Sequence, residues 1–519
     1  MPIPNIKQFH RLNGNAGPAS LRFSLDPAFE GVREGIAAML GFGEAAAPVD
    51  GAAAEFLLNP SLAEEAYRIR AGDGGVFIEA GGAAAAVYAA SVLRQLSMEN
   101  GGIVPACEIA DEPRFSWRGL SMDVCRHFFP LDTLKRLVGL MAFYRMNRLH
   151  LHLSDDQGFR FESERFPKLN GVGSFRESTL VKRDGVKRQD GAPHGGYYTK
   201  EELRELVRFC KARGIEIVPE LDMPGHAVAM IASYPELTCL PCAERPIKVA
   251  TSFGVSEFSK ILLCAGNEGT FQFICGLLDE IMEVFPFSYV HLGGDEAVKE
   301  NWAKCPKCRE TMRREGLKNE RELQGWFLSR VKRYLEGRGR KAIVWNDGLC
   351  KTLEQDTICQ YWTRFSGGGA RKAAAWVNRG GSMIASDFLH LYFDYPYAAT
   401  PLEKTFRYEP ALRGVKKTRR SGVLGAECAV WTEWIDGEEK LFFNTLPRLA
   451  AAAETMWRQS RGGYRDFLRR LQPHCALYER MGLNWAKDAG RSKPFFSRIR
   501  RTAAFLLRDT HAELSENMR

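Results

Sequence analysis

The chain has 519 residues, 45% of them hydrophobic and 26% charged, a composition that excludes an intrinsically disordered protein. Its formal net charge of +9 is spread along the chain without a nucleic-acid-binding motif, so we expect no nucleic-acid partner. No apolar run approaches the roughly 20 residues that a membrane-spanning helix needs, and the N-terminus lacks the order of a secretory signal. We therefore expect no membrane partner and a cytoplasmic location, with two or three domains at this length.

A small α/β domain is predicted over residues 1–112. Residues 67–71 and 76–80 have the composition of strands, and the turn GDGG between them predicts a hairpin. Residues 83–99 carry apolar side chains at helical spacing, so we expect a helix that packs one face on this hairpin.

The next part, residues 113–460, alternates short apolar runs with stretches of helical periodicity, a pattern typical of a repeated β/α architecture. Eight strands are predicted, at 117–124, 148–155, 215–222, 289–296, 341–348, 357–362, 382–388 and 422–433. Helices are predicted between them, for example at 131–146, 199–214 and 269–285. The predicted fold is a (β/α)8 barrel of the TIM type.

Residues 461–519 are helical in pattern and basic. We interpret them as a helical extension packed on the barrel, and a helix of this kind could form the interface of a homodimer.

Polar and aromatic side chains gather where the predicted barrel strands end. These residues are Asp123, Asp155, Asp222, Asp295, Glu296, Trp345, Trp362 and Glu433. Active sites of such barrels are assembled at the C-terminal ends of the strands. The sequence therefore predicts an active site there.

The string HLGGDE at 291–296 is the most informative of these strand ends. Two glycines before an acidic pair remove side-chain bulk and let another group approach the backbone closely. Taken alone, the pair Asp295 and Glu296 could equally be a helix cap or a salt bridge.

Several motifs in this order resemble family 20 of the glycoside hydrolases, the β-N-acetylhexosaminidases. They are WRGLSMDVCRHFFP, LHLHLSDDQGFR, PELDMPGHA, YVHLGGDEA, IVWND, QYW, LYFDY and VWTEW, between about residues 113 and 434. The segment that ends in LRQL also resembles the small α/β domain that precedes the barrel in that family.

The resemblance implies a retaining, exo-acting hydrolase in which the 2-acetamido group of the substrate attacks its own anomeric carbon. Glu296 would be the acid/base, Asp295 would orient the acetamido N–H, and Tyr392 would donate a hydrogen bond to the amide oxygen. Because Tyr392 and Asp394 are two residues apart on extended chain, Asp394 would face the same side and reach the hydroxyl at C4 or C6.

The remaining site residues are implied in the same way. Trp345, Trp362 and Trp431 would enclose the acetamido methyl and the sugar face, with Glu433 as a hydroxyl acceptor beside Trp431. Arg118 would form a fork of hydrogen bonds to the C3 and C4 hydroxyls.

Asp155 and His226 would form a relay behind Glu296. The expected partner is an amino-sugar glycoside. The sequence leaves open whether GlcNAc or GalNAc is preferred, because that depends on how Asp394 and Glu433 meet the C4 hydroxyl.

Parts of the sequence are also compatible with two other functions. His150 and His152 form an HxH on a barrel strand, which could bind zinc in a metal-dependent amidohydrolase, although the other strand ends offer too few histidines. A sugar-binding protein that has lost catalysis is disfavoured because the acid, the orienting Asp and the Tyr occur together.

Thirteen cysteines, an odd number scattered through the chain, indicate reduced thiols. Two CxxC pairs, Cys239 with Cys242 and Cys305 with Cys308, have the spacing of a structural zinc site. Since the pairs lie more than sixty residues apart, we expect unliganded thiols and neither metal nor cofactor.

Overall fold

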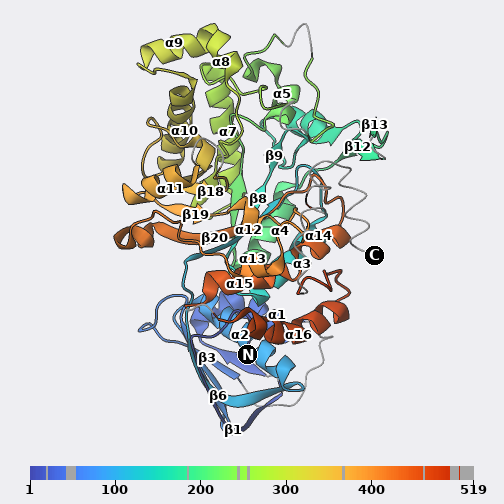
Figure 1. Ribbon diagram of the computed structural model, residues 1–519, viewed down its shortest axis with the longest axis vertical. Coiled ribbons are helices and arrows are strands. Elements are labelled where there is room, and N and C mark those ends of the chain that lie inside the picture. Colours follow the sequence, from blue (N-terminus) through green and yellow to red (C-terminus); the bar gives the residue numbers. More distant parts are fainter. Residues whose placement is uncertain are drawn as a thin grey trace.

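The computed structural model describes residues 1–18, 22–42, 54–183, 186–241, 246–253, 258–364, 369–459, 462–490 and 502. Figure 1 shows a sheet domain at one end of the molecule and the barrel with its helices above it.

The N-terminal domain is built on one mixed sheet of six strands in the order β1-β6-β4-β5-β3-β2. The strands are β1 (Gln8–Pro18), β2 (Phe23–Leu25), β3 (Ala54–Leu58), β4 (Tyr67–Gly72), β5 (Gly75–Ala80) and β6 (Ile103–Asp111). Strands β4 and β5 pair antiparallel from Tyr67 opposite Ala80 to Gly72 opposite Gly75, which is the predicted hairpin. Alternate side chains of β4 are buried, as a sheet with one covered face requires.

Helix α2 (Ala83–Glu99) packs on this sheet, and helix α1 (Arg33–Leu40) packs on α2. Every residue of α2 from Ala85 to Ser97 is buried. The helix therefore buries more than the single face that was predicted to pack on the hairpin. The second face packs on the barrel helix α3 (Leu131–Phe143), where the Ser91 hydroxyl donates to the Phe143 carbonyl at 2.6 Å. Helix α2 is therefore the layer between the two domains.

The barrel is closed by eight parallel strands, in the order β15-β16-β17-β18-β19-β20-β7-β8. They are β7 (Trp117–Asp123), β8 (Arg148–His152), β15 (Glu216–Glu220), β16 (Tyr289–His291), β17 (Lys341–Trp345), β18 (Ile358–Tyr361), β19 (Met383–Ala385) and β20 (Val423–Val430). All eight predicted strands are present, and the predicted (β/α)8 barrel behind a small α/β domain is confirmed.

Helices and short strand pairs occupy the connections of the barrel. Besides α3, the helices are α4 (Lys200–Lys211), α5 (Val228–Ser233), α7 (Glu268–Val284), α8 (Glu300–Lys304), α9 (Pro306–Arg314), α10 (Glu320–Glu336), α11 (Gly369–Asn378), α12 (Phe388–Leu391), α13 (Leu402–Phe406), α14 (Glu438–Thr445) and α15 (Arg448–Trp457). The long loop after β8 holds the pairs β9 (Ser154–Asp155) with β10 (Gly158–Phe159), β11 (Phe175–Arg176) with β14 (His194–Gly195), and β12 (Leu180–Arg183) with β13 (Val186–Gln189). Helix α4 begins directly after Thr199, whose side chain forms a reciprocal capping box with Glu202.

The last described helix, α16 (Tyr464–Arg480), lies within the predicted extension 461–519. Arg470 joins it to the barrel helix α15 through an ion pair with Glu454 at 2.7 Å, and to the N-terminus through the Pro2 carbonyl at 2.9 Å. Within the described ranges, no helix combines the length and the apolar character that crossing a membrane requires. The cytoplasmic location and the homodimer stay predictions.

Candidate active site

The loop that follows β16 carries the acidic pair. The strand was predicted to run to residue 296 but ends at His291, because Gly293 and Gly294 adopt positive φ angles of 65° and 104°. A Cβ atom on Gly293 would lie 1.6 Å from Oδ1 of Asp222, so only glycine fits beside that carboxylate. Asp295 and Glu296 consequently project from a loop at the C-terminal end of the barrel.

His226 connects this acidic pair to Asp155. Its Nδ1 lies 3.2 Å from Oδ1 of Asp155, and its Nε2 lies 3.5 Å from Oε2 of Glu296 and 3.6 Å from Oδ2 of Asp295. His226 and Glu296 both have positive φ angles, 49° and 47°, which are unusual outside glycine. Backbone strain of this kind persists where the surrounding structure fixes it, commonly at functional sites. The structure thus places Asp155, His226 and Glu296 in the expected order.

Asp295 lies in a less exposed position than its neighbour. Its side chain is 14% exposed and that of Glu296 is 30% exposed. Burial raises the pKa of Asp295 to about 7; His226 opposes this rise, and the negative charge of Glu296 adds to it. Oδ1 of Asp295 is buried without a hydrogen-bond partner among the described residues. A buried carboxylate oxygen in this state is suited to accept a hydrogen bond from a ligand.

Aromatic rings form a continuous wall beside these carboxylates. The Trp345 and Trp431 rings lie 6.0 Å apart, Trp431 and Tyr392 also 6.0 Å, and Tyr392 stacks on Trp362 at 6.2 Å with 13° between the planes. Trp345 is fully buried and donates its indole N–H to Glu220 at 2.8 Å, whereas Trp362 and Trp431 are partly exposed. The three tryptophans and Tyr392 that were predicted to share a site therefore do so.

A second cluster of charges adjoins the wall at Trp431. The Arg126 guanidinium lies 5.2 Å from the centre of the Trp431 ring and pairs with Asp155 at 2.8 Å. Burial raises the pKa of Asp394 well above its usual range, and the charge of Glu433 raises it further. Oδ1 of Asp394 is buried and lacks a hydrogen-bond partner within the described part of the chain. The Arg126 guanidinium can donate hydrogen bonds to sugar hydroxyls, and the Asp394 and Glu433 carboxyl groups can accept them.

Comparison with known proteins agrees with this geometry. Residues 115–460 match the model of the glycosyl hydrolase family 20 catalytic domain, and residues 3–112 match domain 2 of the same family. The chain belongs to glycosyl hydrolase family 20. It is 35% identical to a beta-hexosaminidase of Akkermansia muciniphila over 430 residues, 80% of this chain and 84% of that protein. It is also 34% identical over 445 residues to a beta-hexosaminidase of Porphyromonas gingivalis, covering 82% of this chain and 55% of the relative, so it spans about half of that protein.

Solved structures of the family have the same fold. A crystal structure of a beta-N-acetylhexosaminidase superposes with a TM-score of 0.79 at 30% identity, covering 95% of this chain and 98% of that one. A mutant Streptomyces plicatus beta-hexosaminidase in complex with the product GlcNAc superposes with a TM-score of 0.78 at 28% identity, covering 94% and 96% of the two chains.

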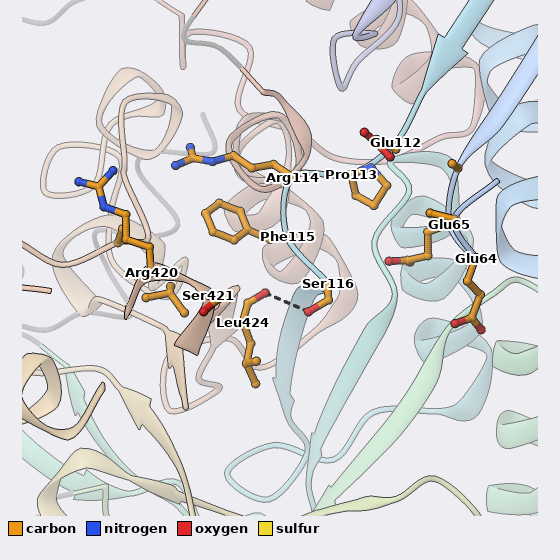
Figure 2. Close-up of a pocket in the computed structure, with 14 residues that line it drawn as sticks. Glu64, Glu65, Glu112, Pro113, Arg114, Phe115, Ser116, Arg420, Ser421 and Leu424 are labelled. Atoms are coloured by element: carbon orange, nitrogen blue, oxygen red, sulfur yellow. Dashed lines mark hydrogen bonds between the residues drawn. The ribbon is translucent and has the colours of Figure 1, made fainter. Parts of the chain in front are cut away.

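Arg118 is not part of this family 20 site, and its predicted role in sugar binding was wrong. It is the second residue of β7 and therefore lies at the opposite end of the barrel, where it pairs with Glu65 at 2.5 Å and donates to the Tyr88 hydroxyl at 2.9 Å. Figure 2 shows Glu65 at the edge of a cavity of about 550 Å³ that is lined by residues before β7 and around the start of β20. Arg118 thus joins the two domains.

Arg126, which the sequence analysis missed, occupies the sugar side instead. Its position relative to the strand could have identified it. Arg126 follows the C-terminal end of β7 by three residues, where barrel active sites lie, whereas Arg118 is near the start of the strand.

The histidines of the HxH motif are enclosed by carboxylates inside the barrel. His150 contacts Glu427 at 2.8 Å and Glu220 at 3.0 Å, and His152 contacts Asp155 at 2.7 Å as well as Glu220. Burial lowers the pKa of His150, but Glu220 and Glu427 outweigh it and raise the value to about 9. Membership of family 20, shown by the match of residues 115–460, overturns the alternative of a metal-dependent amidohydrolase.

Proposed function

We propose that this family 20 glycoside hydrolase is an exo-acting β-N-acetylhexosaminidase that releases terminal β-linked GlcNAc or GalNAc with retention, using the substrate's acetamido group as the nucleophile. The observation that carries the proposal is the buried Oδ1 of Asp295, which has no hydrogen-bond partner among the described residues and lies next to Glu296 and the aromatic wall. A carboxylate oxygen in that position can hold an amide N–H.

In the first step the acetamido carbonyl oxygen forms a bond to the anomeric carbon while the glycosidic C–O bond breaks. Glu296 gives its proton to the leaving oxygen, and an oxazolinium ion results. Asp295 accepts a hydrogen bond from the acetamido N–H and offsets the positive charge that grows on the amide nitrogen. In the second step Glu296 takes a proton from water, which attacks the anomeric carbon and restores the acetamide with net retention.

The Tyr392 hydroxyl would donate a hydrogen bond to the amide oxygen. The Tyr392 ring lies 6.0 Å from that of Trp431. Burial raises the pKa of Tyr392 well above its usual range, so the hydroxyl keeps the proton that it needs as a donor. The neighbouring tryptophan faces would exclude water from the reacting centre.

His226 and Asp155 would act on Glu296 as positioning residues. Burial lowers the pKa of His226, but Asp155 and the acidic pair outweigh it and raise it well above its usual range. An imidazolium between Asp155 and Glu296 would hold the acid/base in place through both proton transfers.

Arg126, Asp394 and Glu433 would bind the hydroxyls on the far side of the sugar ring. Two solved relatives support a GlcNAc-type ring, since the titles of the Streptomyces plicatus structure and of a Vibrio harveyi exo-β-N-acetylglucosaminidase, 27% identical with a TM-score of 0.80 over 94% of this chain and 78% of that one, both name bound GlcNAc.

The direct test compares hydrolysis of a chromogenic β-GlcNAc glycoside with that of the matching β-glucoside. We expect cleavage of the first and none of the second, and a fall in kcat of about 10²- to 10⁴-fold in Glu296→Gln. The exposed Glu300, at the start of α8, gives the matched control Glu300→Gln, which should keep full activity. Equal rates on both glycosides would contradict amide participation, and binding without hydrolysis would favour the inactive sugar-binding alternative.

A further inference from the structure

Four cysteine side chains meet at the C-terminal end of the barrel, outside the sugar site. They are Cys239, Cys264, Cys305 and Cys308. Their sulfur atoms all lie within 4.8 Å of one another, and Cys264, Cys305 and Cys308 are buried. Figure 1 shows α8 and α9, which flank Cys305, at the end of the molecule opposite the N-terminal sheet.

The distances between these sulfurs match four thiolates around one ion. Cys239 and Cys264 each lie 3.7 Å from Cys308, and Cys264 lies 3.8 Å from Cys305. Tetrahedral zinc binds cysteine sulfur at about 2.3 Å, which separates the sulfurs of one site by about 3.8 Å. A disulfide would need about 2.05 Å, and all four cysteines are free. We propose that Cys239, Cys264, Cys305 and Cys308 bind one structural Zn²⁺.

The membership of this cluster differs from the set that the CxxC spacing suggested. Cys239, Cys305 and Cys308 do come together, so the expectation of separate thiols does not hold for them. Cys242 lies outside the described residues, and the fourth sulfur belongs to Cys264, which is in neither CxxC pair.

The backbone around the cluster is shaped to bring two loops into contact. A Cβ atom on Gly266 would lie 2.4 Å from the backbone of Lys307 and Cys308, so glycine allows the segment after Cys264 to touch the start of α9.

A metal here would join the two loops that carry the catalytic residues. The loop after β15 provides His226, Cys239 and Cys264, and the loop after β16 provides Asp295, Glu296, Cys305 and Cys308. The two loops are already hydrogen-bonded, from the Val298 N–H to the Ser259 carbonyl at 2.9 Å and from the Trp302 indole to the Leu263 carbonyl at 3.0 Å. Four protein ligands leave no open position, so the ion would stabilise structure and not take part in catalysis.

Metal analysis of the intact protein tests the site. Protein purified under reducing conditions from zinc-supplemented cells should contain one zinc per chain by plasma mass spectrometry. Cys264→Ser should lose this zinc and melt several degrees lower, whereas Cys475→Ser, at a half-buried thiol on α16, should keep it. Cys242→Ser should also keep the zinc.

A second measurement does not depend on the folding of any variant. Wild-type protein refilled with Co²⁺ should show the intense visible bands and thiolate-to-cobalt charge transfer of a tetrahedral four-sulfur site. The proposal is overturned if the wild type holds no zinc and gives no such spectrum, if stoichiometric iron is found in place of zinc, if two of the four cysteines form a disulfide under reducing conditions, or if Cys242→Ser loses the zinc while Cys264→Ser retains it.

Discussion

Asp295 and Glu296 are adjacent in the sequence, yet their side chains lie in different environments that suit different roles. Asp295 is the less exposed of the two and has one carboxylate oxygen free for a ligand, whereas Glu296 is more open to solvent and touches His226. An acid/base must exchange protons with water and a leaving group, while a residue that offsets charge benefits from a low local dielectric. The positions fit the two proposed roles.

The pH dependence of kcat/KM should report Asp295. Burial raises its pKa to about 7, so the ionised form that the mechanism needs predominates above that pH and is lost below it. Below this pKa, we expect kcat/KM to fall about tenfold for each pH unit. The pH below which kcat falls should be lower than this, because a hydrogen bond from the N–H of the bound substrate stabilises the ionised form of Asp295. An Asp295→Asn profile with the same acid limb would contradict this assignment.

Arg126 and Arg118 provide a matched pair of tests at the two ends of β7. Arg126→Lys keeps the charge but not the planar fork, so kcat/KM for the β-GlcNAc glycoside should fall about 10- to 100-fold, corresponding to about 1.4–2.7 kcal/mol of lost hydrogen bonding. Arg118→Lys should leave kcat/KM unchanged and lower the melting temperature, since Arg118 pairs with Glu65 between the domains. The reverse result would restore the role that the sequence suggested for Arg118.

The strands of the barrel show how far sequence patterns extend and where they stop. Apolar runs bounded by turns located all eight strands, because strand burial inside a barrel leaves a strong signal. The end of β16 was misplaced by five residues, from His291 to 296, because nothing in HLGGDE shows that the glycines adopt positive φ. Cys264 was missed for a related reason, since its partners come from loops distant in the chain.

Gly293→Ala should test the loop after β16. The added methyl would overlap Oδ1 of Asp222 and displace Asp295 and Glu296, so we expect a loss of activity of about 100-fold. Gly339→Ala is the control: Gly339 has a similar φ of 72° with nothing within 4 Å of the added Cβ, so it should cost about 1–2 kcal/mol of stability and no activity. Equal activity of the two variants would show that the Gly293 contact does not position the acidic pair.

The two domains are held together by a buried polar cluster around Asp111. Its carboxylate accepts hydrogen bonds from Tyr67 at 2.7 Å, Arg145 at 2.7 Å and Trp457 at 3.0 Å, and both Asp111 and Arg145 have fully buried side chains. Asp111 and Trp457 lie 346 positions apart in the chain, so no local pattern could have predicted the cluster.

Asp111→Asn should therefore destabilise the whole molecule. It leaves the Arg145 charge buried without its partner, which costs about 3–5 kcal/mol. Urea unfolding measures this loss. Glu112→Gln is the neighbouring control, because Glu112 and its partner Lys7 are each 40% exposed, and the change there should be below about 0.5 kcal/mol. Equal effects of the two substitutions would rule out the Asp111 cluster as a support of the domain interface.

The proposed mechanism requires the substrate's amide to attack its own anomeric carbon. The most direct measurement is kcat/KM for a series of chromogenic β-GlcNAc glycosides in which the acetamido methyl carries none, one, two or three fluorines. Fluorine withdraws electrons from the carbonyl oxygen, so kcat/KM should fall steeply and in order along the series. Equal kcat/KM values along the series would contradict this mechanism, because they would mean that the amide is not the nucleophile.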